Sequence, residues 1–379
     1  MINEEALKAY LKKEFKDIIQ VDIRKLGSGV QGSGFLIEMK TPDGTQSYVV
    51  KTLRSEGLGH DYPSDRAAVF LLDLDEFKNL PGHVKAVDVL SEMEDGSIKS
   101  IGGGREYYLL MERGEGRHYF NDLSEFVHKD RLEVSDIEKI KAMTTYLAEI
   151  HSVKKDSKTL YWRKLRDTVG HGECLMGVLD TYPEGTLSYD GMAEIIKKSV
   201  DWIYRLKPKY NRLSQIHGDF HPGNIWFREV RSKKSEVSPI VHPTPSRGEG
   251  KGEGENSNIG TEIDFVLLDR SRGPWGDPAD DVTALTINYI FFSIKHYGSV
   301  KGPYLEGLNL FFENYVTLTG DNEIFEVVAP FFAFRGAVIA NPVFYPELTP
   351  EQRRLIFRFM NNALDDDRFK LEKVNDYLL

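Results

Sequence analysis

The stretch Ile216-His217-Gly218-Asp219-Phe220-His221-Pro222-Gly223-Asn224-Ile225-Trp226-Phe227 places an aspartate five positions before an asparagine, directly ahead of an apolar run. A second apolar run, residues 265–268, follows further along the chain and ends in Asp269. An aspartate, an asparagine and a second aspartate in this order are the polar groups required for phosphate transfer from ATP to a hydroxyl. The sequence therefore predicts a kinase-type site.

The loop between Asp219 and Asn224 determines how these two side chains are expected to lie. Pro222 and Gly223 are incompatible with a regular helix, so both side chains are predicted on a bent loop from which they can converge. Asp219 would accept the proton of the substrate hydroxyl. Asn224 and Asp269 would hold Mg²⁺ against the phosphates.

The same loop contains two histidines, His217 and His221, at the i, i+4 spacing of a zinc-binding pair on a helix. Because Pro222 and Gly223 argue against a helix here, a metalloenzyme is rejected. We expect His217 to be a structural hydrogen-bonding residue and His221 to line the loop.

A glycine-rich segment near the N-terminus has the G-x-G-x-x-G spacing through Gly27, Gly29 and Gly32. A dinucleotide-binding loop of this spacing opens a helix, whereas residues 35–39 have the apolar pattern of a strand. The alternative that remains is a strand-loop-strand flap whose backbone amides approach phosphates.

Lys51 closes the next apolar strand and is predicted to contact the α- and β-phosphates as a point charge. A solvent-exposed lysine at a strand edge is the alternative. Such a lysine usually needs an acidic partner on a nearby helix, and Asp65 is the first choice, with Glu76 second. An acidic residue at a helix start is often only a cap, so this pairing stays open.

Apolar patterning predicts an α+β fold, with strands first and helices afterwards. The strands are expected at residues 18–23, 35–39, 48–53, 84–90 and 107–111, with helices at 3–15 and 65–79. After Arg113 the pattern is helical, with apolar stripes over 137–150 and from Met192 through Val200 to Leu206. Residues 1–111 would form an N-terminal nucleotide-binding lobe, and residues 112–379 a larger catalytic and substrate-binding lobe.

Capping signals place two helix starts in the second lobe. Ser135 with Glu138 has the spacing of a capping box. Thr349 is expected as the N-cap of the last long helix, with Pro350 in its first turn and Gln352 completing the box.

Residues 229–262 differ in composition from the rest of the chain. Serine, lysine, glutamate, glycine and proline dominate, and almost no apolar residues are available to offset the entropy of ordering. We expect a flexible insertion at the surface between the two parts of the catalytic site, with a regulatory or docking role as the alternative.

Bulk composition excludes several classes of protein. The 379 residues have a formal net charge of -10, which disfavours nucleic acid or an anionic membrane as the main partner. Cys174 is the only cysteine, so no internal disulfide can form and a cytoplasmic setting is expected. No apolar run approaches the length of a membrane helix, about 20 residues.

The segments His217-Gly218-Asp219 through Asn224, Asp269, and Gly276-Asp277-Pro278 through Asp281 resemble the aminoglycoside phosphotransferase/choline kinase family. Leu147-Ala148-Glu149-Ile150-His151-Ser152 is similar to that family's helix ahead of the catalytic loop. The resemblance covers nearly the whole chain apart from residues 229–262. It implies a bilobal, protein-kinase-like fold with ATP between the lobes.

The resemblance also implies residue roles. Asp219 would be the base, Asn224 and Asp269 the Mg²⁺ ligands, and Lys51 a phosphate contact. Backbone groups near Met111 to Arg113 would read the purine.

One departure from the family lies after Asp269, where Arg270 and Ser271 stand in place of an aromatic residue followed by glycine or an acidic residue. Arg270 or Arg272 would add charge near the γ-phosphate or form a surface ion pair. Asp277 and Asp281 are expected to be caps and loop anchors for the next helix instead of catalytic groups.

The predicted function is ATP-dependent phosphorylation of a hydroxyl on a small molecule, with GTP left open as the donor. An aminoglycoside, a choline-like amine or an amino-alcohol would serve as acceptor, and a cationic acceptor is one option. A protein kinase is the first alternative, although residues 271–280 leave little room for an activation segment. A non-catalytic nucleotide-binding protein of the same fold is the second. The oligomeric state is not predicted.

Overall fold

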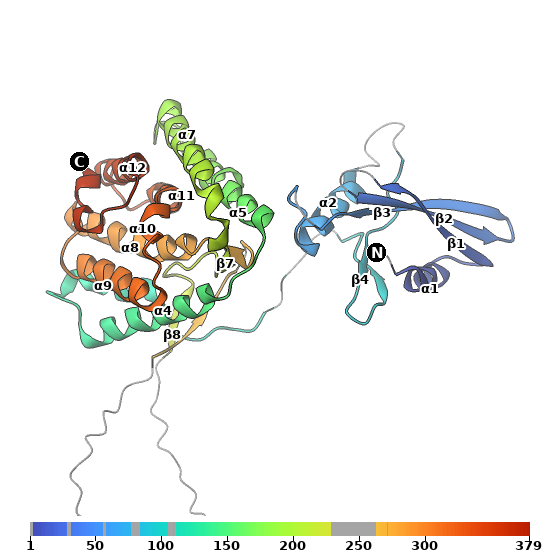
Figure 1. Cartoon of the computed structure of the whole chain (residues 1–379), viewed down its shortest axis with the longest axis horizontal. Coiled ribbons are helices and arrows are strands. Elements are labelled where there is room, and N and C mark those ends of the chain that lie inside the picture. The colour runs from blue at the N-terminus through green and yellow to red at the C-terminus, as the bar shows by residue number, and fades with distance from the viewer. Residues whose placement is uncertain are drawn as a thin grey trace, which may run out of the picture. The chain divides into compact units, whose positions relative to one another are not determined.

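The computed structural model describes residues 3–28, 32–55, 58–76, 84–104, 109, 111–228, 263–270 and 272–379. Within it the chain forms two compact units, Met1–Glu112 and Arg113–Leu379 (Figure 1). Three predictions lie outside the described residues: Gly29 of the glycine-rich segment, the insertion 229–262, and most of the strand at 107–111. No helix in the described part of the chain is long and apolar enough to cross a membrane.

The first unit is built on a three-stranded antiparallel sheet in the order β1-β2-β3. Its strands are β1 (Gln20–Ser28), β2 (Gly32–Thr41) and β3 (Gly44–Leu53). Side chains alternate between the two faces of a strand, and one face carries the buried residues. Helix α1 (Glu4–Glu14) contributes its apolar stripe to the same core. The buried members of that core are Leu7, Leu11, Val21, Ile37 and Met39.

The remaining elements of the first unit are α2 (Pro63–Glu76) and the short hairpin of β4 (Leu90–Glu92) and β5 (Ile98–Ser100). The prediction of a strand over 84–90 is wrong for most of its length, because the paired strand begins only at Leu90. Of its three valines only Val89 is buried, while Val84 and Val87 are exposed, so the apolar pattern does not mark a buried strand.

The second unit is mostly helical. Its helices are α3 (Tyr119–Glu125), α4 (Val134–Ser152), α5 (Lys158–Gly170), α6 (Leu175–Asp180), α7 (Tyr189–Leu206), α8 (Ala279–Tyr297), α9 (Gly302–Thr319), α10 (Ile324–Val327), α11 (Ala329–Ala340) and α12 (Pro350–Asp365). Short 3-10 turns lie at Phe126–His128, Lys207–Arg212, Leu371–Lys373 and Asp376–Leu378. Its strands are β6 (Arg117–His118), β7 (Ser214–Gln215), β8 (Ile225–Arg228), β9 (Asp264–Leu267) and β10 (Trp275–Gly276).

Helix α8 forms the centre of the helical unit, with α9 and α11 packed against it (Figure 1). Nearly every residue from Ala279 to Ile294 is buried, so α8 has no exposed polar face. A helix that is buried all round must be covered by other elements, and the apolar helix α11 supplies part of this cover. Two buried carboxylates, those of Asp280 and Asp281, lie in the first turn of α8, and a third, that of Asp277, lies just before the helix.

Of the two capping boxes predicted from the sequence, one is present in the structure. The box at Thr349 is confirmed, since its side chain accepts from the backbone of Gln352 and the Gln352 side chain accepts from the backbone of Thr349. The box predicted at Ser135 and Glu138 is wrong. Helix α4 begins two residues earlier, where Glu133 and Asp136 form the reciprocal pair.

The stripe predicted along the helix before Pro208 is correct in part. In α7 the buried face includes Ile195, Ile203 and Leu206, together with Trp202, whereas Val200 is exposed. The predicted α+β class is nevertheless confirmed, with a small antiparallel sheet in the first unit and a larger, mainly helical second unit.

Candidate active site

The segment 216–224 is held at both ends by short strand pairs of the second unit. Before it, β7 pairs with β10, and the backbone N–H of Ile216 donates to Pro274 O over 2.9 Å. After it, β8 pairs with β9, and the N–H of Leu268 donates to the carbonyl of Asn224 over 3.0 Å. Asp269 follows Leu268 directly, so it lies one residue beyond the backbone that is hydrogen-bonded to Asn224.

Asp281 fixes the first part of this loop. Its two carboxylate oxygens accept the backbone N–H groups of His217 and Gly218, each over 2.7 Å. The carboxylate is completely buried, and Nε2 of His151 lies 3.2 Å from it. Burial alone would raise the pKa of Asp281, but the hydrogen bond and charge of His151 and the donated amides lower it below its ordinary value. Asp281 was expected to be a cap or loop anchor for its own helix, and the loop that it anchors is the one that carries Asp219.

Asp219 lies at the centre of a charged cluster. Arg335 donates from Nη1 to its Oδ1 over 2.6 Å, and Nη1 of Arg272 lies 3.4 Å from the same oxygen. On the other oxygen, Oδ2, the Nδ2 of Asn224 donates over 3.3 Å, and Nε2 of His221 lies 3.7 Å away. Burial raises the pKa of Asp219, but the two arginines outweigh it and lower the pKa to about 2. The carboxylate is therefore ionised at neutral pH.

Asn224 is oriented by the residue it is predicted to work with. Its Nδ2 donates to the backbone carbonyl of Asp219 over 3.0 Å as well as to the carboxylate. Both bonds use the amino group, which leaves the amide oxygen as the atom that can bind a cation.

Asp269 follows β9 and is exposed, with a left-handed backbone at φ 52°. It contributes to the lining of a cavity of about 210 Å³, together with Tyr146, Ile150, Gln215, Ile216, His217, Leu267, Leu268 and Arg270. An exposed carboxylate and an amide oxygen are ligand types that suit Mg²⁺, which binds through one or two protein ligands and takes the rest from phosphates and water. Among the described residues no group of three histidine, cysteine, aspartate or glutamate side chains could hold a metal by itself.

The arginines that follow Asp269 occupy different places. Arg270 donates to the backbone carbonyl of Ile216, at 2.9 and 3.2 Å, and so ties the segment after β9 to the start of the loop. Arg272 is stacked over the ring of Phe334, 4.7 Å from its centroid, with its charge directed at Asp219. The pair that Arg272 forms with Asp219 is largely buried, so it is not the surface ion pair considered as the alternative, and its role toward a phosphoryl group stays a prediction.

His217 and His221 both accept hydrogen bonds within the loop. The Nδ1 of His217 accepts from the N–H of Asp219 over 3.3 Å, and the Nδ1 of His221 accepts from Gly223 over 3.1 Å. Burial lowers the pKa of His221 below its ordinary value. These roles agree with the expectation of a structural His217 and a His221 that lines the loop.

Asp277 anchors the start of α8, as expected, and also forms a buried ion pair. Its Oδ1 accepts from the N–H of Ala279 over 3.0 Å. Arg212 donates to both carboxylate oxygens, at 3.0 and 3.2 Å, and the hydroxyl of Tyr161 donates to Oδ2 over 2.8 Å.

Arg335 is a residue of this site that the sequence-based prediction missed. It lies in α11, is 4 % exposed, and contacts the loop across 116 residues of chain. The sequence does contain a signal for it: Arg335 is the only charged residue in the apolar helix Ala-Pro-Phe-Phe-Ala-Phe-Arg-Gly-Ala-Val-Ile-Ala.

The predicted residues of the first unit lie on and around its sheet. Gly27 and Gly32 belong to β1 and β2, and a Cβ added to Gly32 would lie 1.8 Å from the carbonyl oxygen of Thr52. The close packing of β2 against β3 thus requires a glycine at position 32, independently of any contact with phosphates. Lys51 is exposed on β3, next along the strand from the half-buried Val50.

Asp65 accepts the backbone N–H of Tyr62 over 2.7 Å at the start of α2, which is the capping role considered as its alternative. Met111 and Arg113 are exposed residues at the end of the first unit and the start of the second. The roles of these residues toward a nucleotide stay predictions.

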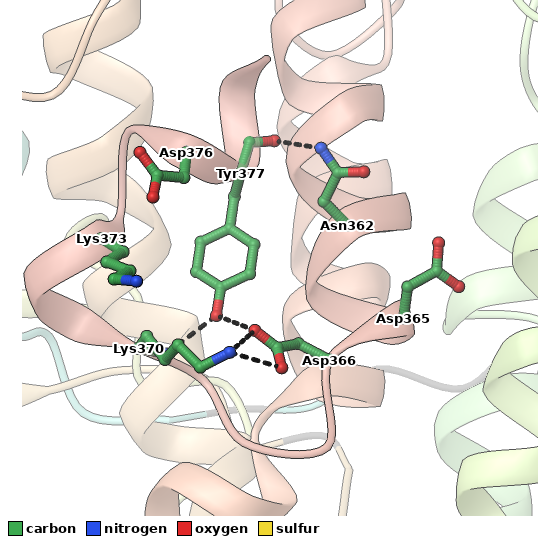
Figure 2. Close-up of a pocket in the computed structure, with 7 residues that line it drawn as sticks. All are labelled: Asn362, Asp365, Asp366, Lys370, Lys373, Asp376 and Tyr377. Carbon is green, nitrogen blue, oxygen red and sulfur yellow. Dashed lines mark hydrogen bonds and ion pairs between the residues drawn. The ribbon is translucent and has the colours of Figure 1, made fainter.

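A larger pocket, of about 330 Å³, lies at the C-terminus and is shown in Figure 2. Of the aspartates that line it, Asp366 accepts hydrogen bonds from Lys370, at 2.8 and 2.9 Å, and from the hydroxyl of Tyr377 at 3.0 Å. The residues lining this pocket are all drawn from 362–377, so it does not include the loop of Asp219.

No protein-family model matches the chain, and no curated protein matches it. Solved structures do match over most of its length, at low identity and with low TM-scores. A glucosamine kinase is 13% identical with a TM-score of 0.37, covering 95% of this chain and 93% of that one. An ethanolamine kinase from Plasmodium vivax is 10% identical with a TM-score of 0.32, covering 98% and 84%. A choline kinase from Cryptosporidium parvum is 12% identical with a TM-score of 0.27, covering 99% and 93%.

Proposed function

We propose that this protein transfers the γ-phosphate of ATP to a hydroxyl group of a small molecule, with Asp219 as general base. The observation that carries the proposal is the geometry of one loop. An ionised carboxylate at Asp219 and the amide of Asn224 are hydrogen-bonded over 3.3 Å on a loop fixed by Asp281, and Leu268, one residue before Asp269, is bonded to the Asn224 carbonyl. The loop thus supplies a proton acceptor and one amide oxygen for a divalent cation, and Asp269 is proposed as the second oxygen ligand.

The reaction makes limited demands on this chain. The acceptor hydroxyl donates a hydrogen bond to Asp219 and gives up its proton to that carboxylate as its oxygen bonds to the γ-phosphorus. The bond between the γ-phosphorus and the bridging oxygen breaks, and ADP leaves with the electron pair. Asp219 then releases the proton to water. A carboxylate with a pKa of about 2 is a weak base, and it suits a loose transition state in which orientation of the hydroxyl matters most.

Asn224 and Asp269 would hold Mg²⁺, which when bound neutralises charge on the phosphates. Asn224 contributes its amide oxygen, because its amino group is bonded to Asp219. Asp269 contributes an exposed carboxylate at the end of β9.

For the first unit we propose that Lys51 and the backbone of the glycine-rich segment contact the phosphates. The open face of the sheet supports this, since Val49 is 58% exposed and lies between two strand positions that face the core. Backbone groups near Met111 to Arg113 are proposed to read the purine.

The ion pairs around Asp219 limit which kinds of acceptor its carboxylate can bind. Two carboxylates of this cluster, those of Asp219 and Asp280, are each paired with Arg335 at 2.6 Å. These two groups are therefore not free to bind a cationic acceptor, and the proposal is confined to a small hydroxyl compound.

The test is a panel of hydroxyl metabolites and aminoglycosides incubated with Mg·ATP and the whole protein, read by product mass. One product heavier by a single phosphate, formed together with ADP, supports the proposal. Labelling of many proteins in a lysate would favour a protein kinase. Binding of Mg·ATP with no phosphorylated product in a broad panel would favour a non-catalytic nucleotide-binding protein.

A further inference from the structure

Arg335 brings a buried positive charge to the base from a helix far along the chain. Its guanidinium makes three bonds: Nη1 to Oδ1 of Asp219 at 2.6 Å, Nη2 to Oδ1 of Asp280 at 2.6 Å, and Nη2 to the carbonyl of Gly218 at 3.0 Å. The ring of Phe334 lies 4.6 Å from the guanidinium carbon. Two carboxylates and a carbonyl, from the 216–224 loop and from α8, are thus joined through one side chain of α11.

The bond to Gly218 completes a clamp on a single residue of the loop. Asp281 accepts the N–H of Gly218 over 2.7 Å, while Arg335 donates to its C=O. Gly218 has φ 89°, a backbone conformation that suits glycine and sets the turn immediately before Asp219. The adjacent carboxylates of Asp280 and Asp281 therefore hold this glycine from both ends, one through Arg335 and one directly.

The two oxygens of Asp219 have different surroundings. Oδ1 faces two guanidinium groups, those of Arg335 at 2.6 Å and Arg272 at 3.4 Å. Oδ2 faces the amide of Asn224 at 3.3 Å and the ring of His221 at 3.7 Å. Because an oxygen in a short ion pair with a buried arginine is a poor proton acceptor, Oδ2 is the oxygen left for the substrate hydroxyl.

We propose that Arg335 is a positioning residue for phosphoryl transfer: it holds Oδ1 of Asp219 and the Gly218 carbonyl so that Oδ2, beside Asn224, receives the proton of the acceptor. This inference rests on the proposed function of the site. Arg335 acts through Asp219.

The test compares Arg335→Lys and Arg335→Gln in the whole protein, with an acceptor identified in the panel. Lysine keeps the charge but cannot reach three acceptors at once. A misplacement of the base by 1 Å can lower turnover about 10²-fold, so kcat is expected to fall toward that extent while KM for ATP stays close to the wild-type value.

A pH profile separates positioning from general stability. The charged and titratable groups around Asp219 include Arg335 from α11 and Arg272 from the segment after β9, with His221 and His217 within the loop. Asp280 of α8 shares Arg335 with Asp219, and burial, together with the charge of Asp219, raises the pKa of Tyr345, which follows α11. Loss of Arg335 in Arg335→Gln removes the nearest cation, so the acid limb of kcat/KM is expected to move to higher pH. Arg335→Lys, which retains a charge, should restore most of that limb.

Arg353 provides the matched control. It is buried to a similar extent, at 7 % exposure, but its guanidinium donates to the carbonyls of Ala340, Tyr345 and Leu348 and, within the described part of the chain, to no carboxylate. Arg353→Gln is expected to lower Tm without moving the acid limb. A wild-type kcat and acid limb in Arg335→Gln, or the same acid limb in both glutamine variants, would overturn the proposal.

A second measurement does not depend on activity. Urea unfolding of Asp219→Asn, Arg335→Gln and the double variant is expected to give non-additive changes at pH 7, because each single change removes the same ion pair between Asp219 and Arg335. Additive changes would overturn the contact on which the inference rests. If the wild-type protein phosphorylates nothing while the changes are non-additive, the proposed function fails and the ion pair stands.

Discussion

Replacement of Asp281 by asparagine tests the anchoring of the loop that carries Asp219. The aspartate uses both oxygens, each 2.7 Å from a backbone nitrogen, and none of its side chain is exposed. Asparagine has one oxygen and one amino group, so it can accept from only one of the two N–H groups. The other N–H would face a second donor in a site from which water is excluded.

The expected cost follows from these two bonds. A hydrogen bond to a charged group contributes about 1.5–3 kcal/mol, and a buried donor left without a partner costs about 1–3 kcal/mol. We therefore expect Asp281→Asn to lower the free energy of unfolding by roughly 2–5 kcal/mol at pH 7. At about 2–4 °C per kcal/mol, Tm should fall by on the order of 5–15 °C.

The assay is urea unfolding followed by circular dichroism, with Asp156→Asn as the control. Asp156 is exposed, so its replacement should stay within about 0.5 kcal/mol of wild type. If Asp281→Asn is as stable as Asp156→Asn, the carboxylate does not hold both amides and the reasoning about the loop is refuted.

Three further predictions concern other parts of the site. Asp277→Asn breaks the buried pair with Arg212 (3.0 and 3.2 Å) and should cost about 3–5 kcal/mol in urea unfolding, and a loss under 1 kcal/mol would contradict this. Asp269→Ala should weaken binding of Mg·ATP in calorimetry while Tm without ligand stays near wild type, and an unchanged affinity would remove Asp269 as a ligand. The pKa of Asp219, lowered from 3.8 to about 2, corresponds to roughly 2 kcal/mol of stability. Because the folded-state pKa is the lower one, this contribution is fully present above pH 3.8 and is lost as the pH falls toward 2. Wild type should therefore lose more stability than Asp219→Asn between pH 5 and 3, and parallel losses would show that the pKa is not lowered.

The residues that sequence spacing could identify are those that local geometry brings together. Asp219 and Asn224 are five residues apart on one bent loop, so their contact needed only the turn at Pro222 and Gly223. Asp269 is predicted to join them, since two apolar runs pair as β8 and β9 and Leu268, directly before Asp269, is bonded to the Asn224 carbonyl.

The contacts that spacing could not identify depend on tertiary packing. Asp281 has the sequence position of a helix cap, yet its partners lie 63 and 64 residues away. Arg335 reaches Asp219 only because α11 packs against α8. In α4 the capping patterns Glu133–Asp136 and Ser135–Glu138 overlap by two residues, and nothing local to the sequence decides which pair caps the helix.

The division of roles between Asp219 and the cation ligands is the central claim, and turnover of Asp219→Asn at saturating Mg·ATP and acceptor tests it most directly. General-base help is worth about 10²–10⁴-fold, so kcat should fall by that factor. The dissociation constant for Mg·ATP, measured by calorimetry on the same variant, should stay at the wild-type value. Full turnover in Asp219→Asn would contradict the account.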